Sequence, residues 1–387
     1  MSSWGQLAQR YNSQQKRKIL SLDGGGIRGV LTLEILSELE NQLKTALGKD
    51  DQFRLSDFFD YIGGTSTGAI IAAGLSLGMS AQQLLDFYEE KGEAMFDKSF
   101  LLKRVKHFYN EGPLLKELKA TFGDGDIDLQ SNKFKSLLLV VTMNRSTDSP
   151  WPISNNPDAK FNNPQRKDCN LRIPLYQLVR ASTAAPAYFR PETLQWDPAD
   201  PEKTFVFVDG GVTPYNNPAF LMYRMATQKA YNLNWKTGEK ELLIVSVGTG
   251  SAPSPGAYNQ LLETLTNLPN NLMYAMQVDQ DINCRTVGRC IFGAPIDLEL
   301  GDIIPTDENG NPLGLDNDAG RHFSYVRYNA DLSQAGLEKI GLGDIDSDDV
   351  RKMDSTRHMA QLRKVGKEVG KRQVKATEHF KGFMQGS

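Results

Sequence analysis

Four short apolar segments that end in glycine restrict the fold more than any other feature of the sequence. They are "KILSLDGGG" from Lys18, "FFDYIGG" from Phe58, "TFVFVDGG" from Thr204 and "ELLIVSVGTG" from Glu241. Apolar runs of this length that are closed by glycine are typical of buried strands. The stretch "KSLLLVVTMN" from Lys135 predicts a further strand, without the closing glycine.

Helical patterns lie between these predicted strands. Apolar residues recur at three- and four-residue steps from Val30 to Leu47, and helical stretches follow in "GAIIAAGLSLG" from Gly68 and over residues 81–94. Strands that alternate with helices predict an α/β fold, in which a mainly parallel sheet carries helices on both faces.

The remaining stretches give weaker signals. Residues 148–172 are rich in Pro and Asn and are expected to form an excursion loop, whereas residues 251–315 show no clear pattern. Helix is expected beyond Asp344, where Leu362 and Val365 belong to an apolar stripe at helical spacing.

The composition is that of an ordinary globular protein. The chain has 387 residues, 40% apolar and 24% charged, which is enough for one large domain or two and argues against disorder. Cys169, Cys284 and Cys290 show no CxxC spacing, so neither a disulfide framework nor a zinc site is expected. The polar N-terminal residues contain no signal-peptide core, and the longest apolar run is too short to cross a bilayer. We therefore expect a soluble, cytoplasmic protein.

Positive charge is concentrated near the C-terminus. The formal net charge is −3, yet the residues from Arg351 onward include ten Lys or Arg against three Asp or Glu. Such a segment suits an anionic membrane surface or an acidic patch elsewhere on the protein. It is equally compatible with a solvated helix face, and the charge pattern leaves these alternatives open.

The first glycine loop fits two different kinds of site. Gly24, Gly26 and Gly29 match the dinucleotide fingerprint G-x-G-x-x-G, which needs an acidic residue at the tip of a second strand. Asp50 and Asp51 have roughly the right offset but follow a helix in a polar loop, with no strand before them. This argues against a dinucleotide site. The alternative is an oxyanion hole, in which bare backbone N–H groups face a reacting carbonyl.

The second glycine turn has the spacing of a nucleophile elbow. Gly64, Ser66 and Gly68 form G-x-S-x-G between an apolar strand and a helical stretch. In such a strand-to-helix turn the serine hydroxyl is exposed at the start of a helix, whose dipole favours developing negative charge. The structural alternative is a Gly-rich helix start without catalytic meaning.

A serine nucleophile needs a base, and two residues are candidates. The usual order after an elbow is Ser, then Asp or Glu, then His, and His322 is the histidine that this order favours. The others (His107, His358 and His379) suit surface positions. Asp209 ends an apolar strand and precedes two glycines, so it is either a turn former or a catalytic group at the carboxyl edge of the sheet.

Acidic clusters do not predict a metal site. "DGDIDL" from Asp124 has the spacing of a calcium loop, but Leu129 replaces the required glycine and Lys135 the bidentate glutamate. "DENGNPLGLDND" and "DIDSDD" fail the same test. We expect no metal and no cofactor.

Taken together, these motifs resemble the patatin-like phospholipases. Four blocks carry the resemblance and follow one another in the family's order, with "VSVGTG" at Val245–Gly250 in support. They are "DGGGIRG" at Asp23–Gly29, "GGTSTGAI" at Gly63–Ile70, "ASTAAPAYF" at Ala181–Phe189 and "VDGGVTPYNNP" at Val208–Pro218.

The resemblance implies a three-layer α/β/α fold and the hydrolysis of lipid acyl esters by a Ser–Asp dyad, without calcium. Ser66 would be the nucleophile and Asp209 the base. The oxyanion hole would come from the backbone of Gly24, Gly25 and Gly26, and Arg28 would help to fix the loop. The supporting glycines of the two turns would be Gly64, Gly68, Gly210 and Gly211.

The resemblance also implies partners. The substrates would be membrane phospholipids or lysophospholipids, so we expect peripheral contact with a membrane surface and no binding of a nucleic acid polymer. Some bacterial relatives are switched on by a small nucleotide and then degrade membranes, which suggests a regulated effector. A storage or scaffold protein of the same fold is the non-catalytic alternative. We expect residues 1–330 to form the catalytic domain and 331–387 a helical, basic extension.

Overall fold

A computed structural model describes most of the chain. It covers residues 4–11, 15–96, 112–186, 189–197, 199–251, 261–297, 299–304, 306, 308, 320–354 and 356–384, with backbone alone at 94, 112, 113 and 261–270. His107 and nearly all of the acidic stretch 307–318 lie outside the described residues.

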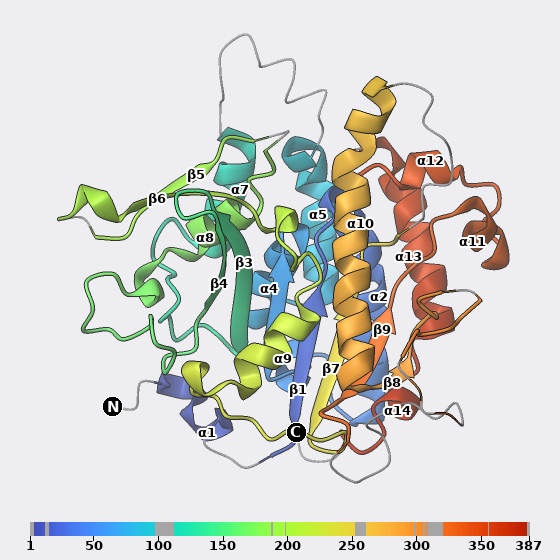
Figure 1. The fold of residues 1–387 in the computed structure, drawn as a ribbon, viewed down its shortest axis with the longest axis horizontal. Helices are drawn as coiled ribbons and strands as arrows, with labels where there is room; N and C mark the ends of the chain where they lie inside the picture. Colours follow the sequence, from blue (N-terminus) through green and yellow to red (C-terminus); the bar gives the residue numbers. More distant parts are fainter. Residues whose placement is uncertain are drawn as a thin grey trace.

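One mixed sheet forms the centre of the fold (Figure 1). Its strand order is β5-β6-β3-β2-β1-β7-β9-β8, and β4 pairs with β3 off this path. The strands are β1 (Arg17–Leu22), β2 (Tyr61–Thr65), β3 (Leu137–Asn144), β4 (Ser149–Ser154), β5 (Glu192–Gln195), β6 (Thr204–Asp209), β7 (Leu242–Val247), β8 (Arg289–Phe292) and β9 (Ser324–Tyr328).

The sheet is parallel from β3 across to β8 and antiparallel beyond β3. β1 pairs in parallel with β2 and β7, while β4 and β6 both run antiparallel to β3 and β5 runs antiparallel to β6. The carboxyl ends of the parallel strands therefore meet at one edge, the upper one in Figure 1.

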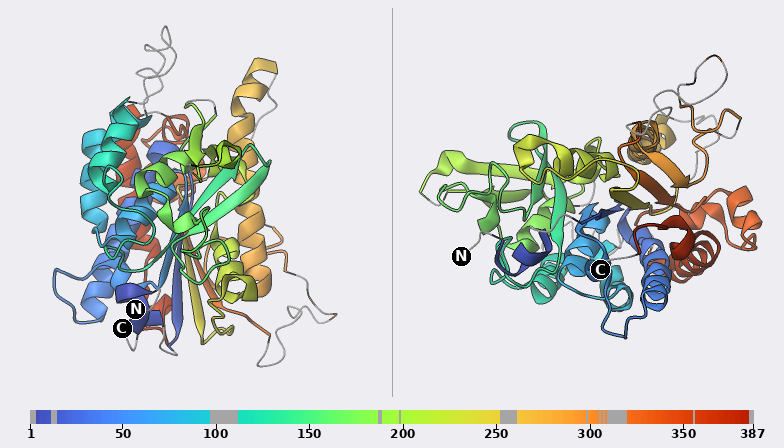
Figure 2. Two further views of the ribbon diagram at one scale, coloured as in Figure 1. Left: turned by 90° about the vertical axis from the view of Figure 1, so that its left-hand side faces the viewer. Right: turned by 90° about the horizontal axis from the view of Figure 1, so that it is seen from below.

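Helices cover both faces of the sheet, as the edge-on view shows (Figure 2, left). This confirms the three-layer α/β/α architecture. The helices are α1 (Ala8–Tyr11), α2 (Gly29–Ala46), α3 (Leu55–Phe58), α4 (Thr67–Ser76), α5 (Ala81–Phe96), α7 (Gly112–Phe122), α8 (Leu175–Ser182), α9 (Ala219–Thr227), α10 (Leu261–Val287), α11 (Gln334–Lys339), α12 (Ser347–Val350), α13 (Met359–Gln373) and α14 (Ala376–His379).

Alternate side chains of the central strands enter two separate apolar cores. On β3, Leu138 and Val140 pack into the larger core, which holds the buried faces of α2, α4, α5, α8 and α13. Leu137 and Leu139 point to the opposite face, where they pack in the smaller core with residues of α9 and with Cys284 of α10. A parallel strand that is covered on both faces is apolar throughout, which explains the unbroken run of Leu and Val in its sequence.

The basic C-terminal helix belongs to the larger core. Leu362, Val365 and Val369 of α13 are buried in that core, and a Cβ atom on Gly366 would lie 2.7 Å from the carbonyl oxygen of Leu31, so α13 packs closely on α2. Arg363 forms an ion pair with Glu34 of α2, over 2.5 Å from Nε to Oε1. Part of the basic segment thus pairs with acidic groups of the same chain, which was one of the alternatives left open.

Two local expectations differ from the structure, and one stretch that shows no clear sequence pattern contains regular elements. Residues 148–172 are not only a loop, because Ser149–Ser154 form β4. The stretch 251–315 contains the long helix α10 and the strand β8. The apolar run that starts at Phe58 begins as the end of a short helix, and its strand starts at Tyr61.

Candidate functional site

Ser66 lies on a sharp turn between β2 and α4. Its backbone has a φ of +56° and a ψ of −123°, a combination that residues with a side chain rarely adopt. A Cβ atom on Gly64 would lie 2.1 Å from the carbonyl oxygen of Gly68, and one on Gly68 would lie 2.4 Å from the carbonyl oxygen of Leu22. Neither glycine that flanks the serine therefore has room for a side chain. The Ser66 N–H donates to the hydroxyl of Ser182 over 2.9 Å. The serine backbone is therefore held in one place, and the residue stays partly exposed.

Asp209 reaches Ser66 because two strands meet end to end along one edge of β3. The last residue of β2, Thr65, is paired with Val141, and the last residue of β6, Asp209, is paired with Thr142. β4 pairs along these same residues of β3, so it takes the opposite edge and leaves β2 and β6 on the same one. Because β2 and β6 run in opposite directions, their carboxyl ends face each other, and the chain must turn away at Ser66.

The carboxylate of Asp209 is directly bonded to the serine. Ser66 Oγ donates to Oδ2 over 2.7 Å, and the N–H of Gly211 donates to Oδ1 over 2.7 Å. Asp209 is only 5% exposed, and burial raises the pKa of its carboxyl to about 6, against the opposing effects of the Ser66 and Gly211 hydrogen bonds and the Arg180 charge. Asp209 is therefore ionised at neutral pH, with a much higher basicity than an exposed carboxylate.

The first glycine loop lies against the turn that holds Ser66. A Cβ atom on Gly24 would lie 3.3 Å from that of Ser66. The N–H of Gly24 donates to the carbonyl of Asn216 over 3.0 Å, so it is not available to a ligand. The N–H groups of Gly25 and Gly26 have no partner within the described part of the chain. Of the three glycines predicted for the oxyanion hole, only these two keep a backbone donor for it.

Arg28 contacts the glycine loop. Its Nε atom is 3.5 Å from the carbonyl oxygen of Gly25, which accepts a long hydrogen bond. Burial, together with the charge of Arg351, lowers the pKa of Arg28 to about 10, so the side chain remains a cation at neutral pH. This position agrees with a role in fixing the loop.

The structure does not bring a histidine to Ser66 within the described residues. His322 precedes β9, whose first residue is paired with Leu243 at the start of β7, and it shares a hydrogen bond with the Tyr223 hydroxyl. It lies at the amino ends of the parallel strands, opposite to the edge that holds the serine. This position contradicts the triad alternative, in which His322 would be the base.

The other described histidines also lie away from Ser66. His358 pairs with Asp349 near the surface, as expected. His379 is only 6% exposed, is stacked on Phe292 and is bonded to the Tyr328 hydroxyl, so the prediction that it lies on the surface is wrong.

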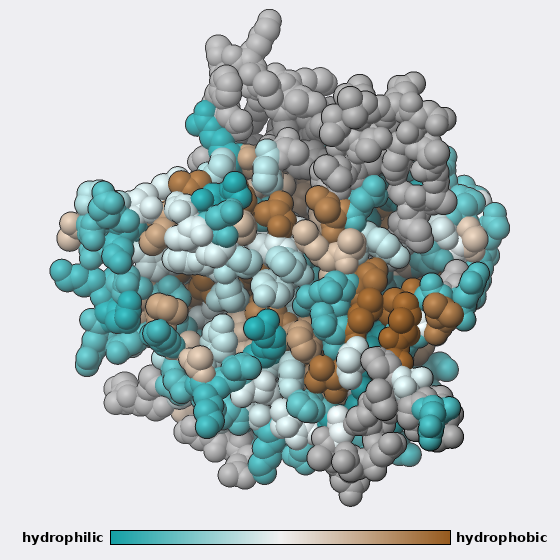
Figure 3. Space-filling view, viewed as in Figure 1, coloured by the Kyte–Doolittle hydropathy of each residue, from teal (hydrophilic) through white to brown (hydrophobic). Residues whose placement is uncertain are grey.

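Apolar side chains stand beside the site. Val212, three residues after Asp209, is 46% exposed, and Leu272 of α10 is 49% exposed. The two segments touch, since a Cβ atom on Gly211 would lie 3.6 Å from the Cε of Met273. The surface of this face is otherwise largely polar, apart from an apolar group lower down beside α10 (Figure 3). The rim of the site can thus contact an apolar ligand.

Within the described residues, no three His, Cys, Asp or Glu side chains converge as metal ligands. No described helix is long and apolar enough to cross a membrane.

The fold and the site define a class of α/β proteins in which a serine on a strand-to-helix turn is bonded to an aspartate beside a glycine loop. A family model described as patatin-like phospholipase matches residues 20–223, more than half of the chain. The protein belongs to the patatin-like phospholipase family.

Three curated relatives show how far the similarity extends. A "cGAMP-activated phospholipase" of Vibrio cholerae is 31% identical over 215 residues, 53% of this chain and 56% of that protein. Another of the same description, from Escherichia coli, is 28% identical over 239 residues, 60% and 62% of the two chains. "Patatin-17" of Solanum cardiophyllum is 30% identical over 250 residues, 60% of each. The chain thus spans less than two thirds of each of these relatives.

Sequence reasoning missed several residues that support the site. Ser182 and Asn216 lie inside the blocks that carry the resemblance. Their positions in those blocks could have indicated that they support the site. Thr249 lies in "VSVGTG" and donates to the carbonyl of Gly24. Arg327 had a weaker signal, a lone charge in the otherwise uncharged strand "SYVRY".

Proposed function

We propose that the protein is a serine acyl hydrolase that cleaves ester bonds of phospholipids or lysophospholipids. The observation that carries the proposal is the 2.7 Å hydrogen bond from Ser66 Oγ to the buried carboxylate of Asp209. Next to it are the N–H groups of Gly25 and Gly26, which no other group of the described residues occupies. An activated hydroxyl and donors for an oxyanion are the parts that ester hydrolysis needs.

In the proposed mechanism, Ser66 Oγ attacks the ester carbonyl while Asp209 Oδ2 accepts the hydroxyl proton. The carbonyl oxygen becomes an oxyanion that accepts hydrogen bonds from Gly25 and Gly26. Asp209 then returns the proton to the leaving alcohol, and an acyl group remains on Ser66. In the second half, a water molecule gives its proton to Asp209 and attacks the acyl carbon. Collapse of this second tetrahedral intermediate breaks the bond between Ser66 Oγ and the acyl carbon, and Asp209 returns the proton to Ser66 Oγ, which frees the fatty acid and restores the serine. A carboxyl pKa of about 6 makes Asp209 a stronger base than an exposed aspartate while leaving it ionised at neutral pH.

Purified protein and a fluorophosphonate probe test this proposal. We expect covalent labelling at Ser66, and release of fatty acid from phospholipid vesicles that mass spectrometry detects. A storage or scaffold protein of the same fold would neither label nor release fatty acid. The lipid products also identify the head group and the acyl position, because each regiochemistry leaves a different lysolipid.

We further propose that a small nucleotide controls the activity. Two relatives are described as activated by cGAMP, and this chain offers a cavity of about 510 Å³ between β4, the loop after it and the β5–β6 hairpin. Trp151, Trp196 and Phe205 line it and can stack on bases, while the exposed Lys203 supplies a charge for phosphate. Trp151 is paired with Thr142, which is itself paired with Asp209, so one strand links the cavity to the site.

Lys203→Glu tests the nucleotide proposal. If a cyclic dinucleotide binds in this cavity, we expect the cGAMP concentration for half-maximal lipid hydrolysis to rise at least about tenfold, because a phosphate contact becomes a repulsion. Fluorophosphonate labelling of Ser66 without nucleotide should be unchanged. Lys49→Glu, at an exposed position after α2 and away from the residues that line the cavity, is the matched control for net charge. If both variants respond equally to cGAMP, the nucleotide binds elsewhere. If cGAMP does not change lipid hydrolysis by the wild-type protein, control by this nucleotide is rejected.

We also propose peripheral contact with anionic membranes through α13. Lys364, Lys367 and Lys371 are exposed on this helix, and each basic residue near an anionic surface contributes about 1 kcal/mol. Reversal of all three to Glu is expected to abolish binding to vesicles that contain phosphatidylserine, as measured by sedimentation in 0.1 M salt. Substitution is preferable to removal of the helix, whose apolar face belongs to the core. Equal sedimentation of the variant and the wild-type protein would contradict this contact.

A further inference from the structure

The peptide groups on either side of Gly24 are held by residues from two other segments. Its N–H donates to the carbonyl of Asn216 over 3.0 Å. Its C=O accepts from Thr249 Oγ1 over 2.9 Å and from Asn216 Nδ2 over 3.4 Å. Gly24 therefore has no freedom to rotate either of its peptide planes without losing a buried hydrogen bond.

The bond from Thr249 determines where the next N–H points. In a trans peptide the C=O of one residue and the N–H of the next point in opposite directions. Because the Gly24 C=O is directed at Thr249, the N–H of Gly25 is directed away from it. Gly25 is also packed directly on Thr249, since a Cβ atom there would lie 2.2 Å from Oγ1. Thr249 thus contacts both residues of the Gly24–Gly25 peptide, whose N–H is the proposed donor.

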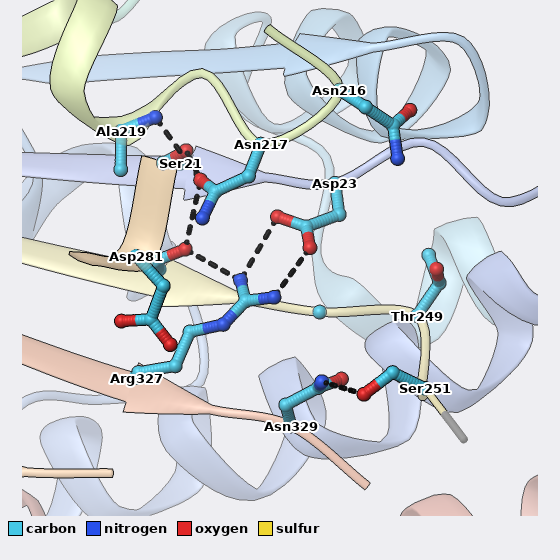
Figure 4. Close-up of polar contacts among 12 residues, drawn as sticks. Ser21, Asp23, Asn216, Asn217, Ala219, Thr249, Ser251, Asp281, Arg327 and Asn329 are labelled. Atoms are coloured by element: carbon cyan, nitrogen blue, oxygen red, sulfur yellow. Dashed lines mark hydrogen bonds and ion pairs between the residues drawn. The ribbon is translucent and has the colours of Figure 1, made fainter. Parts of the chain in front are cut away.

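A buried ion pair anchors the residue before the loop (Figure 4). Arg327 of β9 donates to both carboxylate oxygens of Asp23, from Nη1 to Oδ1 over 2.9 Å and from Nη2 to Oδ2 over 2.6 Å. Arg327 Nη1 also donates to Ser246 Oγ over 2.6 Å. Burial alone would lower the pKa of Arg327, but the Asp23 carboxylate outweighs burial and raises it, so Arg327 keeps its charge. Burial raises the pKa of Asp23, and the charge and the two hydrogen bonds of Arg327 oppose this effect and favour the ionised carboxylate. Asp23 is fully buried, so it cannot move without exposing or separating two charges.

These anchors lie outside the segment that the family model matches, although Ser246 and Thr249 belong to the supporting block "VSVGTG". The family model ends at residue 223, whereas Thr249, Ser246 and Arg327 come from β7, the turn after it, and β9. The glycine loop alone is therefore not a complete oxyanion hole in this protein, because its conformation is set by later parts of the chain.

We propose that Thr249 is a positioning residue whose hydroxyl fixes the Gly24–Gly25 peptide so that the Gly25 N–H faces the reacting carbonyl, with the Asp23–Arg327 ion pair holding the loop in place. The inference rests on the proposed acyl hydrolase function, which it deepens by naming the group that orients the oxyanion donor.

Thr249→Val removes the hydroxyl and keeps the shape of the side chain. We expect kcat for a phospholipid or a p-nitrophenyl ester to fall roughly 10- to 50-fold, because a small displacement of an oxyanion donor is costly. KM should change less than about twofold, because the bond acts on the transition state and not on the bound ester. Thr249→Ala removes the same hydroxyl without a methyl group near Gly25 and should show the same loss.

Thr249→Ser is the decisive variant, because it restores the hydroxyl. It should recover kcat to within about threefold of the wild-type value. Thr227→Val is the matched control: this threonine of α9 also donates to a carbonyl, that of Tyr223, but lies away from the site. The control should lose a similar amount of thermal stability and keep its kcat.

A transition-state analogue gives a second measurement. A fatty acyl trifluoromethyl ketone forms a tetrahedral adduct with Ser66 that carries the oxyanion, so its Ki should rise by the same factor as kcat/KM falls in Thr249→Val. Three outcomes would overturn the inference: unchanged kcat in both Thr249→Val and Thr249→Ala, a Ser variant as impaired as the Val variant, or a loss confined to KM. Failure of the proposed function itself is distinguishable, because the wild-type protein would then neither label with fluorophosphonate nor hydrolyse esters.

Discussion

Ser66→Ala is expected to abolish ester hydrolysis, and Asp209→Asn to lower kcat about 10²- to 10⁴-fold, the usual contribution of a general base. The alanine has no nucleophile. The asparagine has a single side-chain oxygen, so it cannot accept from both Ser66 and the Gly211 N–H as the two carboxylate oxygens do, and it cannot take the serine proton. Rates with a p-nitrophenyl ester and with phospholipid vesicles measure both effects. Both variants should remain folded, because Ser66 is partly exposed and Asn has the size of Asp.

His322→Ala is the control that separates a dyad from a triad. This histidine lies at the opposite edge of the sheet, bonded to Tyr223, so its loss should change kcat by less than about twofold. Substantial activity in Asp209→Asn together with an inactive His322→Ala would contradict the assignment of the base.

The second large effect is a loss of activity in acid. Asp209 must be ionised to accept the proton, and burial raises the pKa of its carboxyl to about 6. We therefore expect kcat/KM to fall tenfold per unit below pH 6, which makes it about a hundredfold lower at pH 4 than at pH 8. A neutral ester substrate is the appropriate probe, because it has no charge of its own that titrates in this range. A profile that stays flat down to pH 4.5 would rule out this titration as the control of activity.

Acid inactivation by this route is separable from unfolding. The pKa of Asp209 rises from 3.8 to about 6 on folding, so the folded state holds the proton more tightly than the unfolded chain does. The contribution of this group to the free energy of unfolding is complete below about pH 4 and is lost as the pH rises through 6. Above that pH the carboxylate is charged while buried, which costs about 3 kcal/mol of stability. Thermal unfolding should therefore show no loss of stability from Asp209 between pH 6 and pH 4, while activity falls.

Local features of the site were predictable, because each depends on a short run of contiguous residues. The turn around Ser66 needs glycine on both sides for steric reasons, so G-x-S-x-G after an apolar strand indicates its shape directly. The position of Asp209 at the end of β6 followed from the apolar run before it. That it touches Ser66 did not follow from spacing, since this depends on β2 and β6 meeting along β3.

The missed features depend on tertiary contacts or on atypical composition. The sequence of β4 is "SPWPIS", and two prolines normally argue against a strand. β4 pairs only with β3, so it has one unpaired edge, and a strand of this kind tolerates prolines, which lack an N–H group. His379 is buried by aromatic partners that precede it by many residues, Phe292 and Tyr328. Nothing in the local pattern around Thr249 or Arg327 indicates that their partners are Gly24 and Asp23.

The sheet order has a consequence for the timing of protein synthesis. β1, which carries the glycine loop, lies between β2 and β7, and the loop is held by Thr249 and Arg327. A ribosome that has released residues up to Asp209 has already supplied the serine and its aspartate, but neither the neighbouring strand β7 nor the loop's anchors. Under the proposed function, an incomplete nascent chain would therefore carry the reactive pair without a working oxyanion hole. Membranes near the ribosome would then meet the active hydrolase only after β9, which carries Arg327, has been translated and has joined the sheet.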